Sequence, residues 1–491
     1  MRKKRYFFIV VFLFSLSPLS SFAEIRCFQD TSLIYYSTTG NVNNSFYPRN
    51  AVKYLQETIF SFKNFLPAKE IFGELHYRIT DDQLIDPQQA SLEKLFFGIR
   101  SNNIEFSIGD IYSSFSDYSL AAAVKGLKLE MRNEGNLFFG LLAGIETTSW
   151  EDFWEKRCED SSLRKYLWGF KISKSFLNNR LRLSFNYGGS KDDSAYVSQS
   201  SDSMLINVCS IVSEYSLNEY INLSSEFAYS FSKRIFNSSV QRKSDKAFKG
   251  DLNFNFDIYN ATFSYSRLAP HFYSAGGYSA QDLESICFNG ILFIFKGIRL
   301  RHYIMFDRDN LKDLISTTTK QINPGVELNF SFAGFDISLG EDVRKRYSVD
   351  KTTNSKTKSY SFFLGKDFNL FYGNLEYRKD SIKDKIDSNQ NRKIDSVSFS
   401  LDSSFSFKKV RSNWEIGVDF QREEYLEMKK ADQHLLYNFG LRLEFPSLWI
   451  MELRAILGDD DYYQNEQDSN QTQYYFSLEK KIKENIAFLL K

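Results

Sequence analysis

Residues 396–407 read Ser-Val-Ser-Phe-Ser-Leu-Asp-Ser-Ser-Phe-Ser-Phe, and this stretch decides the class of fold. Val397, Phe399 and Leu401 alternate with serines, and the same spacing continues to the last phenylalanine of the stretch. Side chains of a β-strand point alternately to its two faces, whereas a helical period would scatter these residues around the whole circumference. The stretch therefore predicts a strand with one apolar face and one polar face.

The same alternation recurs at 164–172, 181–187, 220–232, 252–258, 413–421 and 435–445. The chain contains 48 Phe and 29 Tyr in 491 residues but only 7 Pro, and its mean hydropathy is −0.38. These aromatic residues stand between Ser, Asn, Lys and Glu along the whole chain. Strands with an apolar face toward lipid and a polar face toward a water-filled interior are typical of a transmembrane β-barrel.

The connections between strands alternate in length. Short turns are expected at 101–103, 133–136, 177–180, around Gly297 and at 446–447. Longer polar connections are expected at 81–91, 110–123, 147–163, 190–202, 235–246, 269–284, 309–319, 347–357, 381–393, 424–432 and 460–470. Short periplasmic turns and long external loops are the two ends of an outer-membrane barrel. We predict an all-β protein, a single large antiparallel transmembrane β-barrel of about 24 strands (22–26).

The sequence leaves two possibilities for how the first and last strands close the barrel. The tail 485–491, Asn-Ile-Ala-Phe-Leu-Leu-Lys, resembles half a strand after a turn at Lys483-Glu484. It would make the number of strands odd or would leave the C-terminus on the wrong side. Either the strand predicted near 30–39 is false, or the barrel closes with a short final strand.

The first 23 residues predict export. Arg2 to Arg5 form a positive start, an apolar core runs from Tyr6 to Leu16, and Ser21-Phe22-Ala23 is a small-x-small cleavage site. The apolar core is too short to span a bilayer as a helix, which takes about 20 residues. We predict a cleaved signal peptide at 1–23, a barrel at 24–491 without a separate plug or soluble domain, and location in the outer membrane.

Composition excludes several classes of function. There are 62 basic and 61 acidic residues, so the chain has no overall charge that would favour nucleic-acid binding. The four cysteines, at 27, 158, 209 and 287, have no metal-ligand spacing, and scattered free thiols are favoured over a disulfide between loops. Only four histidines occur, no catalytic constellation accompanies them, and there is no phosphate-binding glycine loop. We predict a protein that is not an enzyme and has no cofactor or metal.

The alternation also assigns residues to the two faces of the barrel. The residues expected to face the lumen are Ser398, Glu415, Asp419, Asn438 and Arg442. The residues expected to face lipid are Phe399, Phe405, Trp414, Val418, Leu441 and Leu443.

Two predicted external loops are candidates for narrowing the lumen. Residues 104–132 contain Gly109 and Asp110, then a polar and aromatic stretch, then a small run and Gly126. This Gly-Asp, loop, Gly-x-x-x-apolar arrangement resembles, over about 25 residues, a pattern of large outer-membrane barrels such as fimbrial ushers, and the small run could lie against the inner wall. The second loop, 267–284, contains a glycine pair that would let it turn inward. The residues proposed for the constriction are Gly109, Asp110, Ala121, Ala122, Ala123, Lys125, Gly126, Gly276 and Gly277.

Two functions fit such a barrel. The first is a channel, a porin-like protein or an exporter, that passes solutes or a polymer through a polar lumen narrowed by loops that fold inward. The second is a scaffold or surface protein whose barrel holds or displays a partner protein. Barrels of 16–18 strands already leave an aqueous channel, so an unobstructed ring of about 24 strands would leak. The expected partners are outer-membrane lipid and a protein bound in the lumen or on the periplasmic side.

Overall fold

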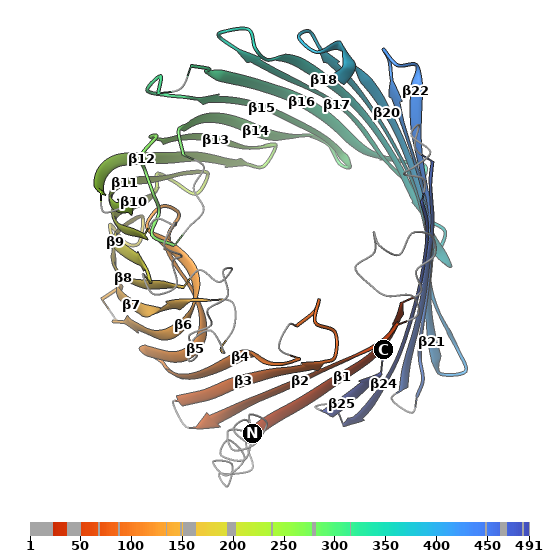
Figure 1. The fold of residues 1–491 in the computed structure, drawn as a ribbon, viewed down its shortest axis with the longest axis horizontal. Helices are drawn as coiled ribbons and strands as arrows, with labels where there is room; N and C mark the ends of the chain where they lie inside the picture. The colour runs from red at the N-terminus through yellow and green to blue at the C-terminus, as the bar shows by residue number, and fades with distance from the viewer. Residues whose placement is uncertain are drawn as a thin grey trace.

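The chain forms one β-sheet that curves into a wide ring, in a computed structural model (Figure 1). The structure describes residues 23–36, 51–66, 69–86, 89–133, 135–147, 150, 164–193, 203–236, 239–276, 281–314, 316–446, 449–461, 469–483 and 486–490. The predicted signal peptide lies outside these residues except for Ala23, and so do Cys158 and Gly277. Among the described residues, no helix is both long enough and apolar enough to cross a membrane.

The sheet contains 25 strands. In chain order they are β1 (Ala23–Tyr36), β2 (Ala51–Leu66), β3 (Lys69–Thr80), β4 (Ala90–Ser101), β5 (Ile104–Ser116), β6 (Leu120–Arg132), β7 (Leu137–Glu146), β8 (Lys165–Phe176), β9 (Leu181–Asp192), β10 (Ser203–Ser216), β11 (Ile221–Phe236), β12 (Ser239–Phe256), β13 (Tyr259–Leu268), β14 (Leu283–Phe295), β15 (Ile298–Asp309), β16 (Thr319–Phe332), β17 (Phe335–Ser348), β18 (Asn354–Asp367), β19 (Phe371–Asp384), β20 (Arg392–Phe407), β21 (Val410–Tyr425), β22 (Lys430–Glu444), β23 (Trp449–Asp461), β24 (Ser469–Lys483) and β25 (Ile486–Leu490). The number lies within the predicted range, and each strand pairs antiparallel with the next along the chain.

The first and last strands join the two ends of the sheet. Residues 27–31 of β1 pair in parallel with residues 486–490 of β25, which also pairs antiparallel with β24. Both of the segments that made closure uncertain from the sequence are therefore strands. The odd number is accommodated because β1 and β25 run in the same direction.

The connections follow the predicted alternation of short turns and long loops, with three clear exceptions. At 424–432 the two strands extend until only residues 426–429 separate them. The stretch 110–123 is not a loop: β5 and β6 continue through it and meet at a three-residue turn, 117–119. The stretch 235–246 is not a loop either, because β11 and β12 extend until only residues 237 and 238 separate them. In the last two of these places polar residues on the two faces of a strand were interpreted as a connection.

The strand register separates the side chains into two continuous faces. Asn186, Ser210 and Ala228 are cross-strand neighbours, and following the pairing partners from β11 onward leads to Ser398 and Asp419 on the same face. The alternate residues form the other face, where large apolar side chains are exposed. These include Phe185, Phe227, Tyr229, Phe399, Ile416, Tyr437 and Phe439.

Candidate functional site

The distal half of the β5–β6 hairpin leaves the barrel wall. Pairing between β4 and β5 ends at Phe96 with Gly109, and pairing between β6 and β7 stops at Lys125 with Ile145. The two strands of the hairpin nevertheless stay paired with each other as far as the turn. We call residues 110–125 the luminal hairpin. In Figure 1 its orange end lies inside the ring, beside β9 and β10.

Two glycines stand where the hairpin departs. Gly109 and Gly126 face each other across the strands. A Cβ on Gly109 would lie 2.0 Å from the carbonyl oxygen of Leu95, and Gly109 has a φ of +113°. A Cβ on Gly126 would lie 2.1 Å from the carbonyl oxygen of Ala143. Only glycine permits this backbone conformation and these close approaches, so the bend depends on both residues.

The residues on the outward side of both strands change from apolar to charged beside these two glycines. On the outward side of β5, Ile104, Phe106 and Ile108 are exposed apolar residues, and the next residue on that side is Asp110. On β6 the outward residues Leu127, Leu129 and Met131 are likewise apolar, and the next one toward the turn is Lys125. The side that is apolar in the lower half of the hairpin thus carries polar and small residues and one tyrosine, Tyr112, in the upper half, as expected for strands that leave the wall.

Asp110 and Lys125 form the first cross-strand pair of the luminal hairpin. Lys125 Nζ lies 2.6 Å from Asp110 Oδ1, and the lysine is only 5% exposed. Asp110 Oδ2 accepts hydrogen bonds from the backbone N–H of Leu95, at 2.7 Å, and from Trp150 Nε1, at 2.6 Å. One carboxylate therefore links the hairpin to β4 and to the connection that follows β7.

Trp150 occupies the place beside β4 that β5 has vacated. Its side chain is 5% exposed and packs in an apolar cluster with Leu75 and Leu92, against Leu95. The ammonium of Lys125 lies 5.2 Å from the centre of the indole ring. The indole thus contacts both charges of the buried ion pair and the strand that no longer has a neighbour there.

The hairpin lies on the polar face of the wall. Leu120, Ala122 and Val124 are buried on one side of it, in a single apolar cluster with residues of β8 and β10–β12. The wall offers glycines under the contact: a Cβ on Gly188 would lie 2.7 Å from the carbonyl oxygen of Ser119, and one on Gly169 would also be obstructed. The opposite side of the hairpin is open, and Tyr112 on it is 67% exposed.

Polar contacts hold the tip of the hairpin. Glu226 of β11 is buried and accepts the backbone N–H groups of Asp117 and Tyr118, at 3.2 and 3.3 Å. Ser116 Oγ lies 2.9 Å from Ser210 Oγ, and Lys249 Nζ lies 2.6 Å from Asp117 Oδ2. Burial, with the nearby carboxylates of Glu226 and Asp117, raises the pKa of Tyr118 above its ordinary value, so this phenol stays neutral.

The second predicted loop packs against the same buried side of the hairpin. Residues 269–276 follow β13, and Phe272 is fully buried with its ring 5.7 Å from that of Tyr118. The N–H of Ala275 donates to the carbonyl oxygen of Ser119, at 3.2 Å. A Cβ on Gly276 would lie within 3 Å of both Leu120 and Ala122. The two segments that were predicted separately to narrow the lumen, 104–132 and 267–284, thus pack against each other.

The structure brings most of the proposed constriction residues together. Gly109, Asp110, Lys125 and Gly126 form the base of the luminal hairpin, Ala121–Ala123 belong to its second strand, and Gly276 lies against it. Their place in β-strands corrects the expected loop, and their role as a constriction stays a prediction. Sequence reasoning missed Trp150, Glu226 and the glycines of the wall, although small residues on the polar face of β8 and β9 were visible in the sequence.

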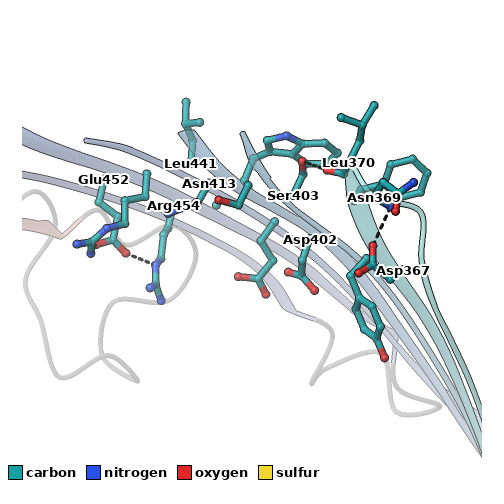
Figure 2. A pocket seen from close by; sticks show the side chains of 16 residues that line it. Asp367, Asn369, Leu370, Asp402, Ser403, Asn413, Leu441, Glu452 and Arg454 are labelled. Atoms are coloured by element: carbon teal, nitrogen blue, oxygen red, sulfur yellow. Dashed lines mark hydrogen bonds and ion pairs between the residues drawn. The ribbon is translucent and has the colours of Figure 1, made fainter. Parts of the chain in front are cut away.

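The predicted lumen residues share one face of β20–β22, across the ring from the hairpin. Ser398 pairs with Asp419, Asn438 Nδ2 donates to Asp419 Oδ2 at 3.2 Å, and Asn413 pairs with Arg442. A recess of about 570 Å³ lies beside these strands. At this recess Asp402 and Arg454 point to one side of the sheet and Leu441 points to the other (Figure 2). Glu415 lines the same recess.

The register places the predicted lipid-facing residues of these strands together on the opposite face. Phe399 pairs with Val418, and Trp414 pairs with Leu441. Phe405 and Leu443 are both cross-strand partners of one serine, Ser412. Among the residues that the structure describes, no group of three or more His, Cys, Asp or Glu side chains could hold a metal ion.

No protein-family model matches the chain, and no curated protein matches its sequence. Among solved structures, the siderophore receptor PirA from Pseudomonas aeruginosa is similar over 94% of this chain and 80% of its own, with 9% identity and a TM-score of 0.49. The P pilus usher (PapC) translocation pore covers 89% of this chain and 96% of its own, with 10% identity and a TM-score of 0.41. A BenF-like porin from Pseudomonas fluorescens Pf-5 covers 66% and 94%, with 11% identity and a TM-score of 0.35.

The fold is a large antiparallel β-barrel. The strand pairing, which joins β1 to β25, and the two faces described above define this fold.

Proposed function

We propose that this chain is an outer-membrane channel whose polar lumen is narrowed by the luminal hairpin and by residues 269–276. The observation that carries the proposal is a hairpin bent out of the wall at Gly109 and Gly126 and packed on the polar face of β8–β12. A strand pair that only completed the wall would have no reason to leave it. One that leaves the wall and packs with a second segment on the polar face occupies space through which solutes would otherwise pass.

The outer face supports placement in a membrane. Large apolar side chains such as Phe227, Tyr229 and Phe399 are 39–50% exposed there, while their neighbours along the same strands are buried or polar. An apolar band around a polar interior is the arrangement that a bilayer stabilises. A signal peptide at 1–23 would direct export. Its cleavage would make Glu24, the second residue of β1, the N-terminus of the mature chain.

Shortening the hairpin without disturbing its register tests the proposal. Tyr112 and Ala123 are directly opposed across the strands, so replacing residues 113–122 by Asn-Gly joins them with a two-residue turn. We expect a larger single-channel conductance in planar bilayers and greater sensitivity of cells to detergents and large antibiotics. The matched control replaces 383–391 by the same turn, because Ile382 and Arg392 are directly opposed in the β19–β20 pair. Equal conductance of the hairpin variant and the unchanged protein would overturn the proposal.

One observation favours the alternative of a partner held in the lumen. Among the described residues, β14–β23 have extensive contacts with no strand other than their sheet neighbours, so no further strand lies over this part of the inner wall. A partner protein there would narrow the ring further. Conductance that falls when co-purified proteins are added back would support this arrangement.

A further inference from the structure

A recess of about 570 Å³ lies between the luminal hairpin and the short turn at 133–136. The hairpin forms one side of it through Ser114 and Phe115, and the inner faces of β6–β9 form the others. The recess exists in this form because the hairpin is folded inward. The lining residues that matter below are Glu130, Arg132, Asn136, Lys171, Ser173 and Arg182.

Positive charge in this recess exceeds negative charge, with three cations and one carboxylate in its lining. That carboxylate, Glu130, already has an ion pair outside the lining, because Lys128 Nζ lies 2.6 Å from it. Arg132 and Lys171 have no carboxylate within 4.0 Å among the residues that the structure describes. Lys171 Nζ instead donates to the backbone carbonyl oxygen of Phe115, at 2.8 Å.

The third cation is only loosely paired. Arg182 lies 3.8 Å from Glu214, and both side chains are about half exposed. Such an exposed contact contributes little and can exchange for another anion. The guanidinium also lies 3.5 Å from the hydroxyl of Ser173, which is buried. Hydroxyl and amide groups beside the cations, including that of Asn136, are donors and acceptors for a hydroxylated ligand.

Two arginines on the opposite wall differ from those of this recess. Arg378 Nε lies 3.1 Å from Asp380, and Arg454 Nε lies 2.6 Å from Glu452 (Figure 2). A cation whose charge is already neutralised attracts an added anion weakly. The recess under the hairpin therefore offers cations that are less neutralised than these two arginines.

We propose that this recess binds anionic groups, carboxylate or sulfate, on a hydroxylated solute or polymer that passes the lumen. The two guanidinium groups offer forked donors that match such oxyanions, and the ammonium of Lys171 adds a third contact at the hairpin. The inference rests on the proposed channel and names the chemistry of its cargo. Because Phe115 and Lys171 join the hairpin to the recess, bound anion and inward hairpin stabilise each other.

Fluorescent dextrans of one chain length give a direct test with the purified full chain in detergent. Dextran sulfate, carboxymethyl-dextran and uncharged dextran are compared by fluorescence anisotropy at low salt. We expect binding of a charged dextran and none of the uncharged one, and the two charged arms distinguish sulfate from carboxylate. Arg132→Gln with Arg182→Gln should weaken binding about tenfold, since both charges face the open recess.

The control variant removes the same charge from the opposite wall, by Arg378→Gln with Arg454→Gln, and should bind as the unchanged protein does. Equal losses in both variants would show a general attraction of the lumen and overturn the site. If neither dextran sulfate nor carboxymethyl-dextran bound, the proposal that the recess binds anionic groups would be overturned. Conductance in potassium chloride is measured in parallel, because a protein that conducts but does not bind retains the channel and loses only this inference.

Discussion

Asp110 and Lys125 face each other at the base of the luminal hairpin, with 2.6 Å between Oδ1 and Nζ and the lysine almost wholly buried. Removing one partner of a buried pair leaves an uncompensated charge and costs about 3–5 kcal/mol. We expect Asp110→Asn to destabilise the inward hairpin by an amount of this order, measured as a lower urea midpoint and a more frequent high-conductance state. Asp110→Asn with Lys125→Met should recover much of the loss.

An exposed ion pair on the same hairpin serves as the control for that prediction. Asp117 pairs with Lys249 at the tip, where the side chains are 60% and 37% exposed. Asp117→Asn should cost no more than about 1 kcal/mol. If both single substitutions had the same effect, burial at the base would not be what holds the hairpin.

The bend at the wall should not tolerate a β-carbon. Gly126→Ala would place one 2.1 Å from the carbonyl oxygen of Ala143, so either β7 shifts or the hairpin is displaced from the lumen. We expect larger conductance and easier proteolysis at the tip. Gly135→Ala is the matched substitution, since nothing lies within 4 Å of its added atom. Normal conductance of Gly126→Ala would contradict the account of the bend.

Two substitutions separate the contribution of Trp150 to packing from that of its hydrogen bond to Asp110. Trp150→Phe keeps an aromatic ring in the cluster but removes the donor to Asp110, and hydrogen bonds to charged groups are worth about 1.5–3 kcal/mol. Trp150→Ala also removes the packing against Leu75 and Leu92, and should cost more. Urea unfolding of the two variants checks the order. An alanine variant as stable as the phenylalanine variant would show that the indole does not fill the place beside β4.

The strand faces assign opposite outcomes to two arginine substitutions. Val418 lies on the face of exposed aromatics, so Val418→Arg should cost about 2–4 kcal/mol in refolding into vesicles. Ser398 lies on the polar face beside Asp419, so Ser398→Arg should cost little. Equal tolerance of the two would refute the assignment of the faces.

N-terminal sequencing of protein extracted from membranes tests the export signal. Mature chains should begin at or near Glu24. Recovery of chains that begin at Met1 would refute cleavage after Ala23.

The barrel could be predicted from sequence because apolar and polar residues alternate along most of its strands, as in 396–407. The prediction failed where that alternation ends. Residues 239–245 of β12 are mostly exposed and polar, because the β11–β12 hairpin continues beyond the apolar band. The same loss of alternation at Asp110 and Lys125 has another cause, since these strands turn into the lumen. The switch from Ile108 to Asp110 is the sequence signal for that turn.

The partners of the site could not be read from the sequence. Glu226 meets the hairpin tip from more than 100 residues away, and Trp150 reaches Asp110 from a connection that carries no motif. The glycines of β8 and β9 were visible, but only the fold shows that a second strand layer lies over them.

The luminal hairpin and the strands on which it packs are far apart in the sequence, and this separation determines the order in which they fold. The turn at 117–119 can form early from local contacts, whereas Glu226, which accepts the N–H groups of Asp117 and Tyr118, is 109 residues later in the chain than Asp117. Contacts between distant residues form slowly, since a long loop must close first. The hairpin therefore stays undocked until β11 is in place, and docking should appear as a separate late phase in refolding kinetics that Asp117→Asn leaves intact and Glu226→Ala delays.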